Sequence, residues 1–590
     1  MEKWFIKNRA GDYKNISRKF KISEFLAKLL INRGITDYKS IEKFLYPTLD
    51  KMYSPSLMKD LDKSAEIIKS KIINKKKIRI VGDFDVDGVM SIYVLYTGIK
   101  KCGGIVDYVI PDRVNEGYGI NNHIVEQAKA DGVDTIITCD NGISAIDQVA
   151  LAKSLGLTVI VTDHHDIPFV IDENGNKSTL YVNADAVVNP KQEDCNYPFK
   201  NLCGAAIAYK LVERLYLMFN LQSDSAYPLL EYVAIATICD VVDLIDENRI
   251  IVKNGLKLLN STKNIGLKAL IKEVGIEGKS IGVFHVGFII GPSINASGRL
   301  DSAIKALQLL LSTDEEEAKI IAKELRELND ERKRLTDDGI KKAVNIINTT
   351  DLKDDKILVI YEPSINESVA GIIAGRIKEK YNKPTIILTK GKEGVKGSGR
   401  SIEECNIFEE LSKCKDILLK YGGHPMAAGL SLEERYIPAL RRRLNENVSL
   451  TDDDLIPKVY IDMELPFENI SIKLINELML LEPFGKGNER PLFGTKNLRI
   501  KRGLLLGVNK NVLKLILSNN NGKTIEGLIF GDVENFESKV LKLYGEDELK
   551  KLYNGIKNNI KIDILYYPSI DEYNGNINIQ LIIQNYRFNK

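Results

Sequence analysis

Short runs of valine and isoleucine alternate with longer segments of helical apolar spacing between residue 76 and about residue 260. Such short apolar runs are typical of buried strands, and strands separated by helix-length segments indicate a parallel, doubly wound sheet. This part of the chain is therefore predicted to be an α/β domain. The predicted strands are 77–81, 105–110, 134–138, 157–162 and 186–189.

The segments on either side of this domain have helical patterns. Residues 1 to about 75 are predicted to be helical, because 25–31 and 65–73 have helical apolar spacing. Residues 313–349 are dense in charge and almost free of helix breakers, and Thr313 and Glu316 have the spacing of a capping box. This pattern predicts one long helix, which either joins two lobes or lies as a solvated helix on the surface.

The C-terminal half shows two further patterns. A second α/β pattern covers about 354–445, with strands at 357–360 and 385–388 and a helix at 368–380. From about residue 456 alternating β-like runs dominate, which predicts a small barrel, and an OB-fold is the natural candidate. The runs are 458–463, 496–507, 511–518, 523–530, 559–567 and 576–583.

These patterns divide the chain into five predicted parts, and its length of 590 residues is too great for one hydrophobic core. The parts are a helical leader (1–75), an α/β domain (76–265), a helical connector (266–350), a smaller α/β domain (351–450) and an OB-like domain (451–590).

Composition adds few constraints. The hydrophobic content of 44% and charged content of 28% are those of an ordinary globular protein. The seven cysteines are scattered without a CxxC pair, so we expect reduced thiols. There is no apolar run of membrane-spanning length and no signal-peptide pattern, so we expect a cytoplasmic protein without membrane association. A net charge of +2 neither supports nor excludes a nucleic-acid partner.

Acidic residues and histidines follow three of the predicted strands. Asp83, Asp85 and Asp87 follow the first, Asp140 follows the third, and Asp163-His164-His165 follows the fourth. Ligands of open α/β sheets bind beyond the carboxyl ends of the strands, so these side chains are expected to converge. Carboxylates and imidazoles suit Mn²⁺ or Mg²⁺. The sequence therefore predicts a metal-dependent hydrolase, with two ions at its site.

The three acids also admit a calcium-loop interpretation, but a calcium loop needs glutamate at its twelfth position, which here is Val94. On an extended segment Asp83, Asp85 and Asp87 would share one face and would repel one another unless a cation lay between them.

Adjacent His164 and His165 would point to opposite sides of an extended backbone, so that one binds metal and the other faces substrate. Asp140 and Asp240 could each simply be a helix-cap or turn aspartate.

Three glycine-rich motifs could be turns, or could allow a phosphate to approach the backbone beside a guanidinium group. They are 291–299, 396–400 and 422–429.

In this order and spacing, the motifs resemble those of the DHH phosphoesterases. The matching segments are GDFDVDG (82–88), CDNG (139–142), TDHHD (162–166), CDVVD (239–243), GSGRS (397–401) and GGHPMAAG (422–429). Within this superfamily the chain resembles the RecJ family, bacterial exonucleases that degrade single-stranded DNA from the 5′ end. The resemblance covers essentially the whole chain, including segments 33–47, 112–119 and 202–206 and the β-rich tail.

The resemblance implies a role for each matching residue. The implied metal ligands are Asp83, Asp85, Asp87, Asp140, His164 and Asp240. His165 would face the scissile phosphate, and with Asp140 it forms the implied catalytic set. The implied substrate-binding residues near the 5′ end are Arg113, Arg299, Ser398, Arg400 and His424. The chain departs from the family pattern at Asp243, where proline is expected, and at Ser293, where arginine is expected. The second departure removes one possible phosphate contact.

The implied function is a 5′-to-3′ exonuclease that uses two Mn²⁺ or Mg²⁺ ions and converts single-stranded DNA to mononucleotides in DNA repair and recombination. The candidate protein partners are a single-strand-binding protein and a helicase. Tyr566, Tyr567 and Tyr573 are candidates for stacking on DNA bases. Two alternatives remain open: a DHH phosphodiesterase for short oligonucleotides or cyclic dinucleotides, and a non-catalytic replication scaffold.

Overall fold

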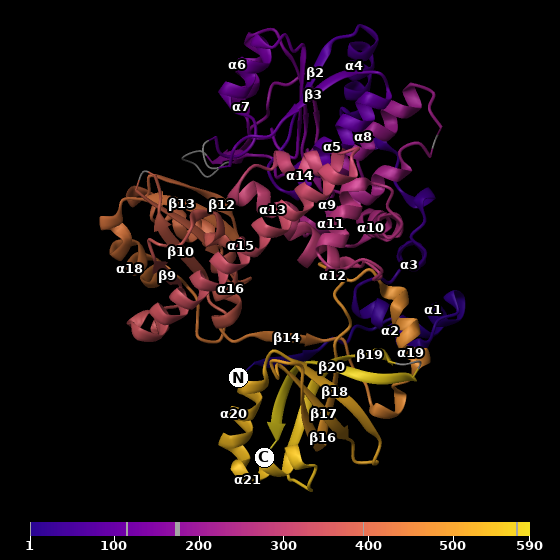
Figure 1. Ribbon diagram of the computed structural model, residues 1–590, viewed down its shortest axis with the longest axis vertical. Coiled ribbons are helices and arrows are strands. Elements are labelled where there is room, and N and C mark those ends of the chain that lie inside the picture. The colour runs from indigo at the N-terminus through magenta and orange to yellow at the C-terminus, as the bar shows by residue number, and fades with distance from the viewer. Residues whose placement is uncertain are drawn as a thin grey trace. The chain divides into compact units, whose positions relative to one another are not determined.

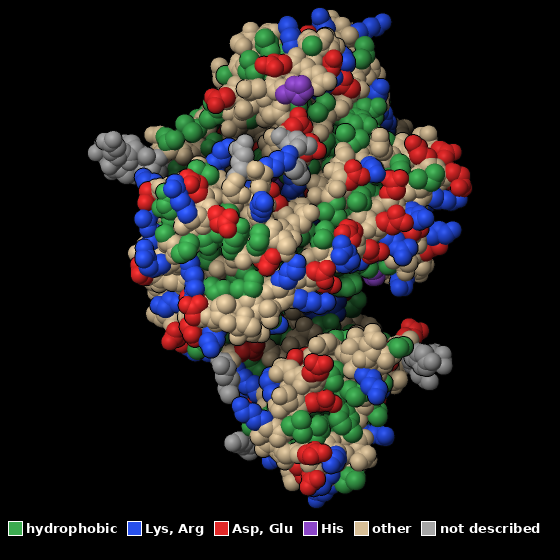
Figure 2. Space-filling view, turned by 60° about the vertical axis from the view of Figure 1, so that its left-hand side comes forward, with side chains coloured by type: hydrophobic (Ala, Val, Ile, Leu, Met, Phe, Trp, Pro, Cys, Tyr) green, Lys and Arg blue, Asp and Glu red, His purple; other side chains and the backbone are tan. Residues whose placement is uncertain are grey.

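The computed structural model describes residues 2–113, 116–171, 177–222, 224–392, 394–573 and 576–589. The chain forms two compact units (Figure 1). The larger unit contains residues 49–242 and 250–457. The smaller unit contains residues 2–48, 243–249 and 458–590. No helix of the described residues is both long enough and apolar enough to cross a bilayer. Figure 2 shows basic and acidic side chains interspersed over one face of the protein.

A five-stranded parallel sheet forms the first domain of the larger unit, as predicted. Its strands, in spatial order, are β3 (Ile105–Val109), β2 (Lys77–Val81), β4 (Thr135–Cys139), β5 (Thr158–Thr162) and β8 (Ala186–Val188). The chain runs from β2 to β3 on one side and then crosses to β4 on the other, so the strand order reverses between β2 and β4. Such a switch point is where open α/β sheets bind their ligands.

Helices cover both faces of this sheet (Figure 1). One face is covered by α6 (Asn122–Ala130) and α7 (Ile146–Ser154). The other is covered by α5 (Val86–Lys101), against which α8 (Gly204–Met218) and α9 (Leu230–Cys239) pack, with α4 (Leu61–Ile73) beside α8. The sheet is therefore buried on both faces, which explains why its strands read as nearly continuous apolar runs.

A helical connector follows, and the predicted long helix is present. It contains α10 (Asp246–Leu259), α11 (Ile265–Glu273), α12 (Val283–His285), the π-helical segment η4 (Val286–Ile290), α13 (Gly291–Leu300), α14 (Ile304–Leu311) and α15 (Glu315–Thr349). The capping-box prediction is wrong, because the N-cap of α15 is Asp314, whose carboxylate accepts the Glu317 amide at 2.8 Å. Helix α15 packs on α11, α13 and α14 and also on the second α/β domain, so it joins two lobes.

The second α/β domain contains a mixed sheet. Its strands, in spatial order, are β12 (Lys420–His424), β13 (Ala427–Leu432), β11 (Val395–Arg400), β10 (Thr385–Lys390) and β9 (Leu358–Tyr361). The connecting helices are α16 (Glu367–Tyr381), α17 (Ile407–Ser412) and α18 (Ile437–Asn447). The motif 396–400 lies within strand β11, so the plain-turn interpretation is wrong for it. The motif 422–429 spans the end of β12, the turn at 425–426 and the start of β13, so it does contain a turn.

The smaller unit contains the predicted barrel. Its strands pair in the order β16 (Phe493–Leu506), β17 (Val512–Ser518), β18 (Thr524–Phe530), β20 (Asn576–Asn589) and β19 (Lys561–Tyr573), and β19 pairs back onto β16. This closed order is that of an OB-fold. The sequence pattern missed two helices between β18 and β19, α20 (Val533–Tyr544) and α21 (Glu546–Asn554).

The three tyrosines proposed to stack on bases have different surroundings. Tyr566 is fully buried and its hydroxyl donates to the Leu465 carbonyl at 2.8 Å, so the stacking prediction is wrong for this residue. Tyr567 is half-buried with the Arg490 guanidinium 4.7 Å from its ring centroid. The side chain of Tyr573 lies outside the described residues.

The N-terminal residues pack within the smaller unit, which the sequence pattern did not predict. The predicted helical character is confirmed by α1 (Tyr13–Phe20), α2 (Glu24–Asn32) and α3 (Tyr38–Leu45). Their apolar side chains share one core with the barrel. The pattern missed strand β1 (Lys3–Ile6), which pairs in parallel with β14 (Lys458–Ile461). A four-residue strand whose partner lies near the other end of the chain leaves no local signal.

Arg249 connects the three segments of the smaller unit. It is fully buried and donates hydrogen bonds to the carbonyls of Phe44 at 2.8 Å, Leu481 at 2.8 Å and Leu480 at 3.0 Å. Its guanidinium also stacks on the Phe44 ring at 3.9 Å. Burial, with a smaller effect of Arg33, lowers the pKa of Arg249 to about 9. This residue therefore stabilises the unit through carbonyl dipoles.

We expect Arg249→Met to destabilise the smaller unit by about 3 kcal/mol, because buried carbonyls lose a charged donor. The matched control is Arg499→Met, since Arg499 is exposed on the barrel of the same unit. Chemical denaturation followed by hydrogen exchange of α2 and β16 measures the effect. Equal stability of the two variants would contradict this role.

Candidate metal centre

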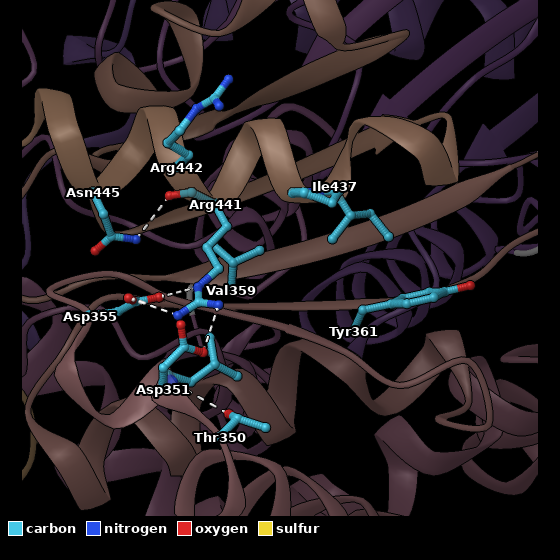
Figure 3. A pocket seen from close by; sticks show the side chains of 11 residues that line it. Thr350, Asp351, Asp355, Val359, Tyr361, Ile437, Arg441, Arg442 and Asn445 are labelled. Atoms are coloured by element: carbon cyan, nitrogen blue, oxygen red, sulfur yellow. Dashed lines mark hydrogen bonds and ion pairs between the residues drawn. The ribbon is translucent and has the colours of Figure 1, made fainter.

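One well-formed pocket lies away from the predicted chemistry. It has a volume of about 480 Å³ and is lined by residues of the second α/β domain, between 350 and 445 (Figure 3). Within it the Arg441 guanidinium is paired with Asp355 at 2.6 Å and Asp351 at 3.0 Å. No predicted site residue lines this pocket, so its size does not identify the functional site.

The predicted metal ligands meet at the carboxyl edge of the parallel sheet. Asp83 follows β2, Asp140 follows β4 and His164 follows β5, and these three strands are neighbours. Asp240 approaches from another direction, at the C-cap of α9. The convergence predicted from strand order is therefore present.

The three acids after β2 are not on one extended segment, so that prediction is wrong. Asp85 is the N-cap of α5 and its carboxylate accepts the Gly88 amide at 3.0 Å. Asp87 lies in the first turn of α5. Aspartate is a strong N-cap residue, and the helix it begins turns the chain away from extended geometry.

The acids nevertheless remain close, and the backbone around them is fixed by glycine and by a helix N-terminus. Asp87 accepts the amides of Gly204 at 2.6 Å and Ala205 at 2.8 Å, both in the first turn of α8. A Cβ at Gly204 would lie 2.7 Å from the Asp140 Cβ, so only glycine allows this approach. Helix N-termini favour anionic groups, which helps to hold Asp87 ionised.

The side chains form three overlapping groups whose ligand atoms lie within 4.8 Å of one another. One contains Asp83, Asp85 and Asp140, and the next contains Asp87, His164 and Asp240. The last contains Asp140, His164 and His165, which places it between the other two. The arrangement has enough oxygen and imidazole donors for two neighbouring divalent cations.

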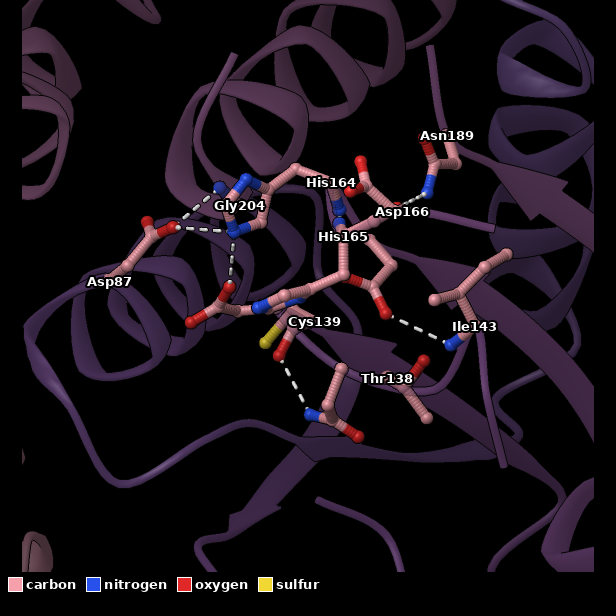
Figure 4. A network of polar contacts seen from close by, with 12 residues as sticks. Asp87, Thr138, Cys139, Ile143, His164, His165, Asp166, Asn189 and Gly204 are labelled. Carbon is pink, nitrogen blue, oxygen red and sulfur yellow. Dashed lines mark hydrogen bonds and ion pairs between the residues drawn. The ribbon is translucent and has the colours of Figure 1, made fainter. Parts of the chain in front are cut away.

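Several of these donor atoms are buried without a hydrogen-bond partner: Asp83 Oδ1, Asp140 Oδ1 and His164 Nε2. His164 Nε2 and Asp140 Oδ1 lie 3.0 Å apart in a geometry that does not make a hydrogen bond. Figure 4 shows Asp87 beside the His164 ring, with Asp87 Oδ2 3.7 Å from His164 Nε2. Buried polar atoms without partners are rare in folded proteins, and a cation between them would satisfy them. The residues present therefore fit Mn²⁺ or Mg²⁺.

Burial and mutual repulsion change the acidity of the site. The pKa of Asp87 is raised to about 6 and that of Asp240 to about 8, by burial first and then by neighbouring carboxylates. The same causes raise the pKa values of Asp83 and Asp140 well above the usual range. Burial, assisted by His165, lowers the pKa of His164 to about 3, which leaves its imidazole neutral and able to bind metal.

His165 has the opposite character because of Asp163. Although burial opposes it, the hydrogen bond and charge of Asp163 raise the pKa of His165 to about 9. One oxygen of Asp163 accepts hydrogen bonds from the His165 ring Nδ1 at 2.8 Å and from the His164 amide at 2.7 Å. The other oxygen accepts a hydrogen bond from the Ile143 amide at 2.9 Å. Asp163 therefore positions both histidines, a role that the sequence reasoning missed.

The prediction that the two histidine rings point to opposite sides of the backbone is wrong, because their centroids are only 4.4 Å apart. Strand β5 ends at Thr162, so the extended geometry assumed in the prediction stops before the pair. The sequence reasoning also missed Tyr118, whose hydroxyl donates to the Asp140 carbonyl at 2.8 Å and lies 3.3 Å from His165 Nδ1.

The predicted substrate-binding arginines gather where the two lobes of the larger unit meet. Arg113 stacks on the Phe84 ring at 4.8 Å, and Arg299 donates to the Ser368 carbonyl at 3.0 Å. Arg400 packs against Gly371, where a Cβ would lie 2.9 Å from its guanidinium. Burial is the main cause that lowers the pKa of Arg299 to about 10, and the positive charge of Arg113 is the second. The same two causes lower the pKa of Arg400. These cations therefore lie close enough to repel one another.

The remaining predicted residues have mixed positions. Ser398 lies in β11 and lines a smaller pocket, and His424 ends β12. The Asp166 pKa is lowered mainly by Lys191, with a contribution from His424, so His424 faces the loop after β5. Ser293 is fully buried. Asp243 belongs to the smaller unit, where it packs on Gly487.

Comparison with known proteins agrees with this geometry. The chain matches three family models: the DHH family N-terminal domain over residues 77–237, the DHHA1 domain over 354–450 and the RecJ OB domain over 461–585. The chain is 36% identical to the single-stranded-DNA-specific exonuclease RecJ of Bacillus subtilis, covering 99% of this chain and 70% of the relative. It is 31% identical to the Escherichia coli protein of the same name, covering 95% of each.

Solved structures show the same likeness. The structure of RecJ from Thermus thermophilus in complex with Mn²⁺ has a TM-score of 0.81 and 25% sequence identity, covering 100% of this chain and 80% of that one. The Mg²⁺ complex of the same protein has a TM-score of 0.76. Because sequence similarity at this level extends over nearly the whole chain, the protein belongs to the RecJ family.

Proposed function

We propose that this protein is a metal-dependent exonuclease that hydrolyses single-stranded DNA to mononucleotides from the 5′ end. The observation that carries the proposal is a buried carboxylate and imidazole cluster that faces a group of arginines. The first α/β domain holds ligands for two cations, and Arg113, Arg299 and Arg400, from that domain, the connector and the second α/β domain, contribute positive charge for phosphate groups. The names of the curated relatives, single-stranded-DNA-specific exonucleases, support the same substrate.

In this proposal Asp83, Asp85 and Asp140 hold one ion, and Asp87, His164 and Asp240 hold the other. When bound there, two ions would supply activation of a water and positive charge for the attacking and leaving oxygens. Asp140 is adjacent to both groups, and we assign it to the catalytic set for this reason. Asp163 and the first turn of α8 keep these ligands in place through backbone hydrogen bonds.

His165 is assigned to the scissile phosphate. Its side chain is 40% exposed, whereas the His164 side chain is 10% exposed. With its pKa at about 9, the His165 ring is protonated near neutral pH and can donate a hydrogen bond to a phosphate oxygen. Asp163 fixes the ring and supports its positive charge, so the donor is oriented before substrate arrives.

Five residues are assigned to the 5′ end: Arg113, Arg299, Ser398, Arg400 and His424. A strand anchored there would present its first phosphodiester to the metal edge and would be cut from that end.

The OB-fold barrel is assigned to binding of the following strand, because such barrels bind single strands on their surface. We also propose the division into five parts given above. We further propose a cytoplasmic role in DNA repair and recombination, in cooperation with a single-strand-binding protein and a helicase.

The stability of the metal-free protein should fall as pH rises. In the fold the pKa of Asp87 is about 6 and that of Asp240 is about 8, whereas in the unfolded chain both are about 4. The raised pKa values therefore contribute fully to the stability of the fold below about pH 4. This contribution is lost as the pH rises through about 6 and about 8. Binding of Mn²⁺ requires the ionised forms, so its stabilising effect should grow over the same window.

Thermal unfolding in EDTA and in Mn²⁺, from about pH 5 to pH 9, measures this linkage. Asp240→Asn should flatten the dependence, whereas Asp416→Asn, at an exposed ion pair, should not change it. An increase in melting temperature on adding Mn²⁺ that is the same at both ends of the window would contradict the proposed site.

The two histidines should separate metal binding from turnover. His164→Ala should lose Mn²⁺ and activity together. His165→Ala should keep Mn²⁺ affinity while kcat falls about a hundredfold or more, as when one transition-state donor is removed. Mn²⁺ titration by calorimetry, with kcat measured at saturating Mn²⁺, distinguishes them. If His165→Ala weakens Mn²⁺ binding as much as His164→Ala, His165 is a metal ligand.

Loss of an arginine at the 5′ end should weaken recognition of that end. Arg400→Gln should raise KM for a 5′-phosphorylated oligonucleotide about tenfold or more, the effect of one charged hydrogen bond. Arg443→Gln is the matched control in the same domain, because Arg443 is half-buried, like Arg400, but is paired with the exposed Asp416 at 2.7 Å. End-labelled substrates also report polarity, and mononucleotides released first from the 3′ end would refute the proposed direction.

A further inference from the structure

The cationic group between the lobes includes an arginine that the family resemblance did not assign. Arg332 lies on α15 and is half-buried. Its Nε donates to the side-chain oxygen of Asn329 at 3.0 Å. The Asn329 amide nitrogen donates to Ser293 Oγ at 3.3 Å, and Ser293 donates in turn to the Ile289 carbonyl at 2.8 Å. A chain of hydrogen bonds therefore runs from η4 through α13 to the Arg332 guanidinium.

Both intermediate residues are well buried. Ser293 is 0% exposed and Asn329 is 4% exposed. Helices α13 and α15 pack directly on each other, and Arg299 lies on the same α13 helix as Ser293. Burial restricts the Asn329 side chain to one position, so the hydrogen bond at Nε also restricts the direction of the Arg332 side chain. Ser293 thus links η4 to Asn329, at a position where the sequence analysis expected arginine.

The charge of Arg332 is not neutralised as the charges of the other arginines on α15 are. Arg326 pairs with Glu273 at 2.9 Å and Arg334 pairs with Glu331 at 2.6 Å, and these partners raise the pKa values of both. Arg332 makes no ion pair among the described residues. Burial and then Arg376 lower its pKa, and Asp337 offsets only part of this.

Arg332 is also a neighbour of the arginines assigned to the 5′ end. Its charge is among the causes that lower the pKa of Arg299, after burial and Arg113. Arg113 is in turn within the electrostatic influence of Asp83 and Asp85 at the metal edge. A row of charged residues, each within the electrostatic influence of the next, therefore extends from the metal centre through Arg113 and Arg299 to Arg332.

We propose that Arg332 is a further phosphate-binding residue for single-stranded DNA, positioned by Asn329 and Ser293. The inference rests on the proposed function. Because Nε is used by Asn329, the terminal nitrogens Nη1 and Nη2 remain as donors for phosphate oxygens. Partly buried cations that repel one another are stabilised when a phosphate lies among them, so the DNA backbone supplies the charge that the protein lacks here.

The test compares full-length variants that differ at one turn of α15. Arg332→Gln removes the proposed contact, and Arg334→Gln is the matched control, since it removes an exposed charge from the same turn. Arg332→Lys keeps the charge but loses the planar donor fork, and Asn329→Ala removes the residue that orients it. The probe is a 5′-phosphorylated, fluorescent single-stranded oligonucleotide, with binding measured by anisotropy in EDTA over a series of salt concentrations.

We expect Arg332→Gln to weaken binding about tenfold. The slope of log K against log salt should become shallower by about 0.7, the value for one phosphate contact to a single strand. Arg334→Gln should change neither quantity. Arg332→Lys should keep the slope and recover part of the affinity. Asn329→Ala should bind the oligonucleotide less tightly but change the slope less than Arg332→Gln does, because the charge of Arg332 remains.

The outcomes separate this inference from the proposed function. If the wild type degrades DNA in Mn²⁺ but Arg332→Gln binds with the affinity and slope of Arg334→Gln, the inference is overturned and the function stands. If Arg332→Gln only lowers the melting temperature and leaves the slope unchanged, Arg332 is structural and the inference is again overturned. If the wild type lacks nuclease activity but the slope changes as expected, the phosphate contact stands and the proposed function fails.

Discussion

Repulsion between buried carboxylates is the constraint on which the site depends. Asp83, Asp87, Asp140 and Asp240 all have raised pKa values, with burial as the main cause and neighbouring acids next. A protein that keeps such groups together without cations must protonate them or lose stability. The fold opposes this repulsion with the first turn of α8 behind Asp87 and with Asp163 behind the histidines. Divalent cations would complete the balance, and the strand order of the sheet determines where they bind.

The arginine group presents the opposite charge problem. Its members come from the first α/β domain (Arg113), the connector (Arg299 and Arg332) and the second α/β domain (Arg400), and mutual repulsion contributes to the lowered pKa values of Arg299 and Arg400. The metal centre thus lacks cations, and the arginine group lacks matching anions. A nucleic-acid substrate with metal ions supplies both, because its phosphates suit the arginines and its scissile oxygens suit the ions. The pocket near Arg441 differs from this site, because the Arg441 guanidinium is already paired with Asp351 and Asp355.

Features with a local periodic signal could be predicted from the sequence. The strands of the parallel sheet, helix α15 and the barrel strands were found because apolar spacing reports burial directly. The convergence of Asp83, Asp140 and His164 followed from strand order alone. Local geometry was harder to predict: Asp85 begins a helix, and β5 ends before the histidine pair, so both expectations based on extended backbone were wrong.

Other features depend on contacts between distant segments. Tyr118 reaches Asp140 from a loop, and the burial of Tyr566 depends on its packing within the barrel. The roles of Asn329 and Ser293 require knowing that α13 and α15 cross. Strand β1 has too few residues to carry a pattern of its own. No single stretch of sequence contains the information for these contacts.

The composition of the smaller unit has a consequence for synthesis of the chain. Residues 2–48 leave the ribosome before the barrel strands that cover their apolar side chains. Throughout translation of the larger unit, this leader has no native partner. Its helices must therefore remain unfolded, or be protected by chaperones, until the C-terminal strands emerge. Residues 2–48 and the barrel segment 458–590 consequently complete folding together. A ribosome that stalls within the barrel segment would release a chain in which the apolar side chains of residues 2–48 are exposed.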